Sequence, residues 1–256
     1  MMVHDFMVTD SKLLLLMPPF LATNEAAHHF ADLFSWHADE AATLLVIDKQ
    51  DFRIVATMEI PPFWVFHFGN ATDMSADEIR FDFIHHDRPD FITKVGYDIM
   101  RGTWNGRPSA KTSYRQAHIN LRDKTMTTEA IPDLQDVEYI QTNPHATLDN
   151  HRYVVMVGYH PEASIPGFNR LWLFDRYSGA ARFYDAARTV MLEEHLIVPK
   201  SDNEDEFWII GTSLDWQKSV TSVTIFDGPD ISQGPVMTAD LDIALPLGLH
   251  GHFVPH

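Results

Sequence analysis

Short apolar segments, each bounded by turn residues, run along almost the whole chain. Several alternate apolar and polar residues, as Ile79-Arg80-Phe81-Asp82-Phe83 does. Alternation with a period of two is typical of a β-strand that buries one face. The expected strands are 13–17, 44–47, 54–60, 64–68, 79–84, 153–157, 171–174, 207–210 and 223–226. Only residues 24–40 have some helical character, and they could equally form an ordered surface loop.

A weak internal repeat favours one all-β architecture. In each copy an apolar run leads into a polar turn and a second strand. The copies are 45–48, a degenerate one at 118–122, 171–175 and 223–227. The last three lie about 50 residues apart, which resembles one four-stranded propeller blade per repeat. The longer first interval predicts an insertion around residues 89–108. Chance recurrence of hairpins is the alternative explanation.

Composition limits the chemistry that the chain can perform. Because none of the 256 residues is cysteine, disulfides and thiol chemistry are excluded, and a transition metal would rest on histidines and carboxylates. The formal net charge of −17 argues against nucleic-acid binding. Residues 1–10 lack the layout of a signal peptide, and the apolar run 13–17 is too short to cross a bilayer. We therefore expect a cytoplasmic protein.

Three of the 15 histidines stand in segments whose surroundings are recognisable. A histidine considered alone is usually a surface residue or a satisfied core residue, so the surroundings decide whether it is a candidate ligand. The three segments are Val3-His4-Asp5-Phe6, Phe66-His67-Phe68-Gly69-Asn70-Ala71 and Pro246-Leu247-Gly248-Leu249-His250-Gly251.

In this order and at this spread, the three segments resemble three of the four iron-ligand segments of the carotenoid cleavage oxygenases. The resemblance implies that His4, His67 and His250 bind Fe(II) in an all-histidine site on a seven-bladed β-propeller. Neutral imidazoles suit Fe(II). Two mild departures are Thr72-Asp73, where the family has an aromatic residue and Glu, and Leu249, where an aromatic residue is commoner.

Two glutamates match the positions at which the family supports its ligands. An imidazole that binds a metal needs an acceptor for its other ring N–H, and the family uses glutamates for this. Glu138 stands in a segment similar to the family's Glu-Phe-Pro-Arg-x-Asn, and Glu194 in one similar to Gly-Glu-Pro-x-Phe-Val-Pro-Arg. We predict that Glu138 supports His67 and that Glu194 supports His250. His195 replaces the family's proline and is not expected to be a ligand.

The family's first ligand segment has no counterpart in these residues. The resemblance therefore implies a single domain over residues 1–256 that forms the C-terminal part of the family fold. This part would be a partial propeller of about four blades, with the N-terminal blades missing. His4 would lie on a terminal strand and is the ligand most prone to stray.

The resemblance implies a non-haem Fe(II) dioxygenase that cleaves a carbon–carbon double bond of a carotenoid, apocarotenoid or stilbene with O2, giving two carbonyl products. No catalytic residue beyond the metal site is implied, and such an apolar substrate would be reached through a peripheral membrane contact. With one ligand missing, these residues alone are expected to be inactive. Two alternatives stay open: a catalytically inactive fragment or interaction module with relic ligands, and a three-histidine zinc site for hydrolysis.

Overall fold

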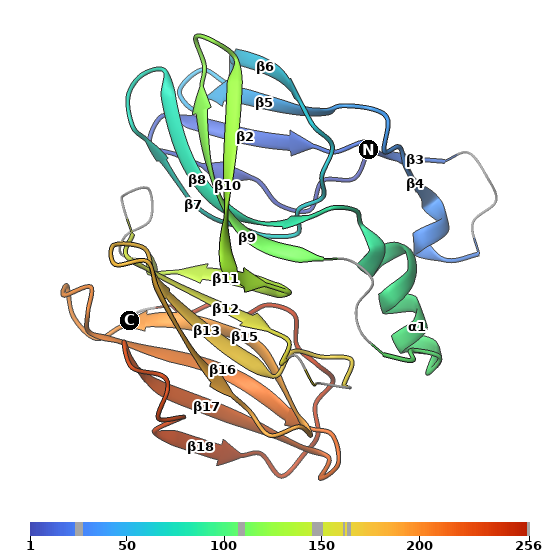
Figure 1. Cartoon of the computed structure of the whole chain (residues 1–256), viewed down its shortest axis with the longest axis vertical. Coiled ribbons are helices and arrows are strands. Elements are labelled where there is room, and N and C mark those ends of the chain that lie inside the picture. The colour runs from blue at the N-terminus through green and yellow to red at the C-terminus, as the bar shows by residue number, and fades with distance from the viewer. Residues whose placement is uncertain (24–27, 107–110, 145–150, 161, 163–164, 255–256) are drawn as a thin grey trace. The chain divides into compact units, whose positions relative to one another are not determined.

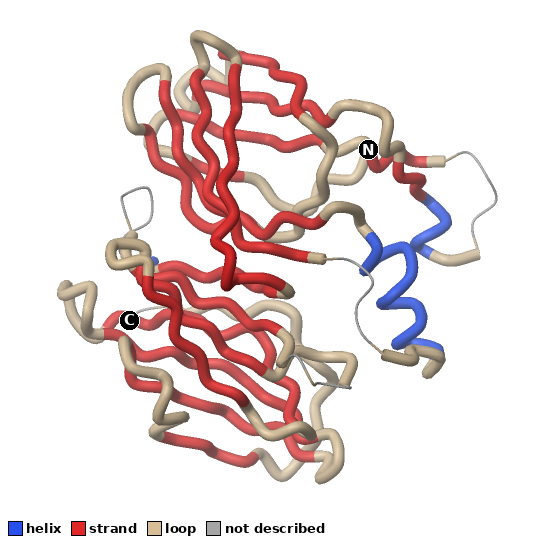
Figure 2. Tube along the Cα trace, in the orientation of Figure 1, coloured by secondary structure: helices blue, strands red, loops and turns tan. Residues whose placement is uncertain are grey.

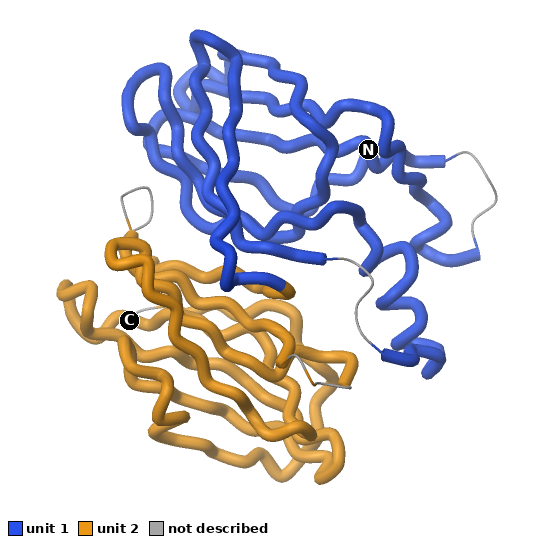
Figure 3. The backbone as a smooth tube through the Cα atoms, in the orientation of Figure 1, with its two compact units in different colours: residues 1–135 blue, residues 136–256 orange. Residues whose placement is uncertain are grey.

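The computed structural model describes residues 1–23, 28–106, 111–144, 151–160, 162 and 165–254. Strands dominate it, as the red segments of Figure 2 show. The chain divides into two compact units, residues 1–135 and 136–256, drawn in blue and orange in Figure 3. No helix among the described residues is long and apolar enough to span a membrane.

The first unit contains two four-stranded antiparallel sheets (Figure 1). One sheet is formed by β1 (Met7–Val8), β2 (Lys12–Met17), β5 (Ala42–Asp48) and β6 (Ile54–Ile60), in that order. The other is formed by β7 (Phe68–Asp73), β8 (Glu78–His86), β9 (Thr112–Asn120) and β10 (Thr125–Gln135). A ribbon of β3 (Phe20–Ala22) and β4 (Phe34–Trp36), with the 3-10 helix Phe30–Leu33, joins β2 to β5.

The second unit repeats the same plan. Its first sheet consists of β11 (Val137–Thr142), β12 (Tyr153–Gly158), β13 (Arg170–Asp175) and β14 (Ala180–Asp185). Its second sheet consists of β15 (Val190–Pro199), β16 (Phe207–Asp215), β17 (Val220–Gly228) and β18 (Met237–Asp240). Each of the four sheets is therefore a four-stranded antiparallel meander, the arrangement of a propeller blade.

The alternating sequence pattern explains the core of each unit. Along β5, Ala42, Leu44 and Val46 are buried and alternate with half-buried residues. In the first unit these side chains join Ile79 and Phe83 of the other sheet in one apolar cluster. The second unit has its own cluster, formed by both of its sheets; it includes Val155, Leu173, Phe207, Ile209 and Phe226.

The sequence repeat corresponds to one structural position. All four copies fall on the third strand of a sheet and lead into the fourth strand; these third strands are β5, β9, β13 and β17. The insertion expected around residues 89–108 is also present. It holds a π-helical turn at Phe91–Val95 and the helix α1 (Gly96–Arg101), both between β8 and β9. Residues 107–110 lie outside the described residues.

One expected strand is wrong, and helical structure in 24–40 is short. In the segment 64–68 Trp64 forms an isolated bridge with His86, and the His67 carbonyl accepts the Ile84 N–H at 3.1 Å, before β7 begins at Phe68. Beside this bridge the Phe66 carbonyl accepts from His4 and the Phe68 N–H donates to Asp5, so the regular pairing with β8 begins only at Phe68. Within 24–40 the described residues form the 3-10 helix and β4, and residues 24–27 lie outside the description.

Candidate metal centre

His4 lies in an extended segment just before β1, and not in a strand as expected. Its ring nitrogen Nδ1 is 2.8 Å from the carbonyl oxygen of Phe66. The neighbouring Asp5 accepts a hydrogen bond from the Phe68 N–H at 3.0 Å, and the Met2 N–H donates to the Phe20 carbonyl at 2.9 Å. The terminal segment is therefore anchored on both sides of His4 within its own unit.

The structure brings His4 and His67 together. Their ring centroids are 5.2 Å apart with the planes perpendicular, and each offers a ligand nitrogen within 4.8 Å of the other. Since a carbonyl only accepts hydrogen bonds, Nδ1 of His4 carries the proton and the lone pair lies on Nε2. Such a hydrogen bond fixes both the tautomer and the ring orientation of a metal ligand.

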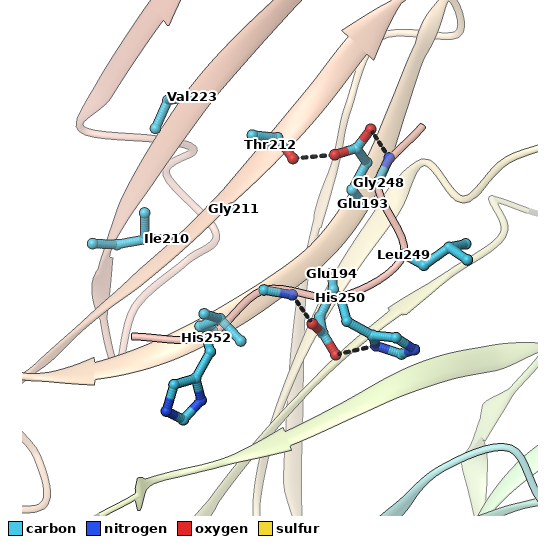
Figure 4. A pocket seen from close by; sticks show the side chains of 12 residues that line it. Glu193, Glu194, Ile210, Gly211, Thr212, Val223, Gly248, Leu249, His250 and His252 are labelled. Carbon is cyan, nitrogen blue, oxygen red and sulfur yellow. Dashed lines mark hydrogen bonds and ion pairs between the residues drawn. The ribbon is translucent and has the colours of Figure 1, made fainter. Parts of the chain in front are cut away.

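His250 follows β18 on an extended C-terminal segment, where Glu194 contacts it (Figure 4). Its Nδ1 is 3.4 Å from Oε1 of Glu194, so a neutral imidazole that donates there keeps its lone pair on Nε2. The other oxygen of Glu194 accepts the Gly251 N–H at 2.7 Å, and Oε1 also accepts the Gln141 amide at 2.7 Å. This carboxylate therefore faces donors only, from β11 and from the C-terminal segment.

Three of the four sheets have a β-bulge in their first strand, close to a candidate residue. In β15 the register shifts between Leu192 and His195, where Glu193 and Glu194 lie. Equivalent shifts occur between Glu138 and Gln141 in β11 and between Phe68 and Ala71 in β7. A bulge adds one residue and re-aims the side chains beside it, which makes it common near active sites. The bulge in β15 explains how the adjacent residues Glu193 and Glu194 are both only 7% exposed.

Glu138 is buried to the same extent, with 7% of its surface exposed. Its Oε2 accepts the N–H of the next residue, Tyr139, at 2.6 Å. Tyr139 has a φ of +54°, an uncommon conformation for a residue with a side chain, and it belongs to the bulge. Because Glu138 and His67 belong to different units, their pairing stays a prediction.

The sequence profile of the RPE65 family, described as Retinal pigment epithelial membrane protein, matches residues 1–255. The chain belongs to the RPE65/carotenoid cleavage oxygenase family. Among curated proteins it is similar to carotenoid cleavage dioxygenase 8 homolog B, chloroplastic, of Oryza sativa subsp. japonica. The identity is 23% over 269 residues, which cover 99% of this chain and 46% of the relative.

Solved structures of the family confirm the fold. Cobalt-substituted apocarotenoid oxygenase of Synechocystis matches with a TM-score of 0.83 and 18% identity. The lignostilbene dioxygenase of Pseudomonas brassicacearum matches with a TM-score of 0.83 and 16% identity. Both matches cover 100% of this chain and 53% or 55% of the other, so the chain spans about half the length of these relatives. The prediction of a partial propeller of about four blades is confirmed.

Several residues around the candidate ligands were missed by the sequence comparison with the carotenoid cleavage oxygenases. The Phe66 carbonyl is a backbone group and leaves no signal in a sequence. Asp5 and Gln141 make their contacts only through the fold. Glu193 did leave a signal, because a second acidic residue beside Glu194 is unusual in an apolar strand, and charged residues are seldom buried without a partner.

His195, which replaces the family's proline, is fully buried and has both ring nitrogens hydrogen-bonded. Nδ1 is 2.8 Å from the Glu193 carbonyl, and Nε2 is 2.9 Å from the Thr224 hydroxyl. A metal could bind only if one of these bonds broke. Burial lowers the pKa of His195 to about 4, so the imidazole is neutral at pH 7.

This histidine should make the protein less stable in acid. Between pH 6.5 and about 4, His195 binds a proton in the unfolded chain but not in the folded protein. The stability that neutral His195 contributes is therefore complete above pH 6.5 and is lost as the pH falls. We expect the free energy of unfolding to drop by on the order of 3 kcal/mol more in the wild type than in H195Q. Urea unfolding at pH 7 and pH 4.5 measures this, and equal drops in both proteins would contradict it.

Proposed function

We propose that His4, His67 and His250 bind one Fe(II) ion as part of a carotenoid-oxygenase-type dioxygenase site. The observation that carries the proposal is the pair His4 and His67, whose rings meet edge to face with Nδ1 of His4 held by a backbone carbonyl. His250 would complete the set from the second unit. Family membership supports this, because the three histidines match three ligand segments in chain order.

The donor set suits this metal. With Nδ1 of His4 and His250 directed at oxygen acceptors, each imidazole presents a neutral Nε2, and neutral imidazole nitrogens bind Fe(II). An iron ion held by these residues would supply O2 activation. The residues of this chain would orient the imidazoles through the Phe66 carbonyl and Glu194, while Glu138 would add support for His67. The chemistry needs no acidic or basic side chain.

The proposed substrate is an apolar molecule with a conjugated double bond. The two solved relatives are an apocarotenoid oxygenase and a lignostilbene dioxygenase, which makes polyenes and stilbenes the candidate classes. Both atoms of O2 would enter the product, so that one alkene and one O2 give two carbonyl compounds. The complete enzyme would also need the first ligand, which has no counterpart in these residues.

Metal binding by histidine variants tests this function. We expect the wild type to bind one Fe(II) per chain under anaerobic titration, and H4A, H67A and H250A each to bind at least about tenfold more weakly. H118A is the matched control, because His118 is an exposed histidine of β9. Equal affinities in all five proteins would refute the site, and no stoichiometric metal in the wild type would favour the relic alternative.

A further inference from the structure

Glu193 stands where the resembled family segment has a glycine, and it has a structural partner that the family pattern does not explain. It is 7% exposed and lies in the bulge of β15 beside Glu194. Its Oε1 accepts the backbone N–H of Gly248 at 2.8 Å, and its Oε2 accepts the hydroxyl of Thr212 on β16. Gly248 lies two residues before His250.

The two adjacent carboxylates bind the C-terminal segment on both sides of His250, as the dashed lines in Figure 4 show. Glu193 accepts the N–H of Gly248, and Glu194 accepts the N–H of Gly251. In a regular strand these side chains would point to opposite faces, so the bulge is what allows both to reach the same segment. The fit is close, since a Cβ at Gly248 would lie 3.0 Å from Glu193 Oε2.

The rest of the segment has few anchors of this kind. Leu241–Asp242 and the residues that follow form no strand, and most are exposed. The Leu245 N–H donates to the Thr221 hydroxyl at 2.9 Å, and among the described residues beyond it the bound backbone N–H groups are those of Gly248 and Gly251. Without Glu193, the seven-residue stretch from Leu245 to Gly251 would keep backbone hydrogen bonds only at its two ends among the described residues, and its conformational freedom would increase.

We propose that Glu193 is a positioning residue that fixes the segment carrying His250 and so sets the direction of its imidazole. Only the metal-binding role of that imidazole rests on the proposed function. The contact itself can be tested without a metal.

One partner of Glu193 can either donate or accept a hydrogen bond, which allows a sharp test. The Thr212 hydroxyl can donate or accept a hydrogen bond, so glutamine at 193 can still accept from Gly248 and donate to Thr212. Alanine at 193 loses both bonds. E193Q should therefore behave like the wild type, and E193A should not. G248P removes the same hydrogen bond from outside the sheet, and its Cβ would also crowd Glu193 Oε2, so it serves if E193A fails to fold.

The full 256-residue chain is compared with these variants by two measurements. In the metal-free protein, hydrogen exchange at the bonded amides of Gly248 and Gly251 should accelerate at least tenfold in E193A, or at Gly251 in G248P, and stay within about threefold in E193Q. In the Co(II)-loaded protein, E193A should lose about 10–100-fold in affinity, and its absorption spectrum should approach that of H250A.

Each outcome decides a separate question. Unchanged exchange and an unchanged Co(II) spectrum in E193A would overturn the role of Glu193. Equal changes in E193Q and E193A would also overturn it, because the charge and not the hydrogen bond would then matter. If H250A binds Co(II) with the affinity and spectrum of the wild type, the proposed function fails. The exchange result would still show whether Glu193 holds the segment.

Discussion

A polypeptide of these 256 residues is expected to cleave apocarotenoids or stilbenes far more slowly than about 1 s⁻¹, the low end of ordinary enzyme rates. The resembled site uses four imidazoles, and the sequence supplies counterparts for three. A site with one ligand too few should hold Fe(II) weakly and let it oxidise. The measurement is the formation of aldehyde products under O2 with added Fe(II).

The matched experiment restores the missing ligand. Fusing the N-terminal half of a solved relative, such as the Synechocystis apocarotenoid oxygenase, to this chain should raise turnover by several orders of magnitude. The same fusion with the first histidine replaced by alanine is the control and should stay inactive. Turnover near 1 s⁻¹ by the 256 residues alone would show that the first ligand is dispensable.

The second large effect is expected for E194Q, which should weaken metal binding about 10–100-fold. The Glu194 carboxylate accepts hydrogen bonds from Gln141, Gly251 and Nδ1 of His250. A glutamine has one accepting oxygen, so its amide N–H2 would face either Gln141 and His250 or Gly251. Gln141 can reverse its own amide, but a backbone N–H cannot. With the glutamine N–H2 beside it, Nδ1 of His250 would have to accept a hydrogen bond, so the ring proton would move to Nε2. A protonated Nε2 cannot bind a metal.

Metal titration of E194Q, beside wild type and E129Q, measures this effect. Glu129 is an exposed residue of β10, so its amide variant controls for the loss of one negative charge. The far-ultraviolet circular dichroism of all three proteins should agree, because the substitution preserves the size of the side chain. Equal metal affinities would mean that Glu194 holds the chain segment without influencing the imidazole.

The sequence by itself determined the strands and the candidate ligands. Alternation located β6, β8 and most other strands, because burying one face of a pleated strand requires that period. The repeat located the third strand of every sheet, since each blade turns between its third and fourth strands with the same apolar-then-polar pattern. The histidines were identified by their neighbours, and the same segments gave the resemblance to the family, which the profile match over residues 1–255 confirms.

The tertiary structure decided how those residues are supported. The expected strand at 64–68 fails because the Phe66 and Phe68 backbone groups bind His4 and Asp5, more than sixty residues away along the chain. The bulge that turns Glu193 and Glu194 toward one segment exists only when β15 pairs with β16. Backbone groups and strand register have no signature in a sequence, because every residue carries the same N–H and C=O and only the fold determines which partners they meet.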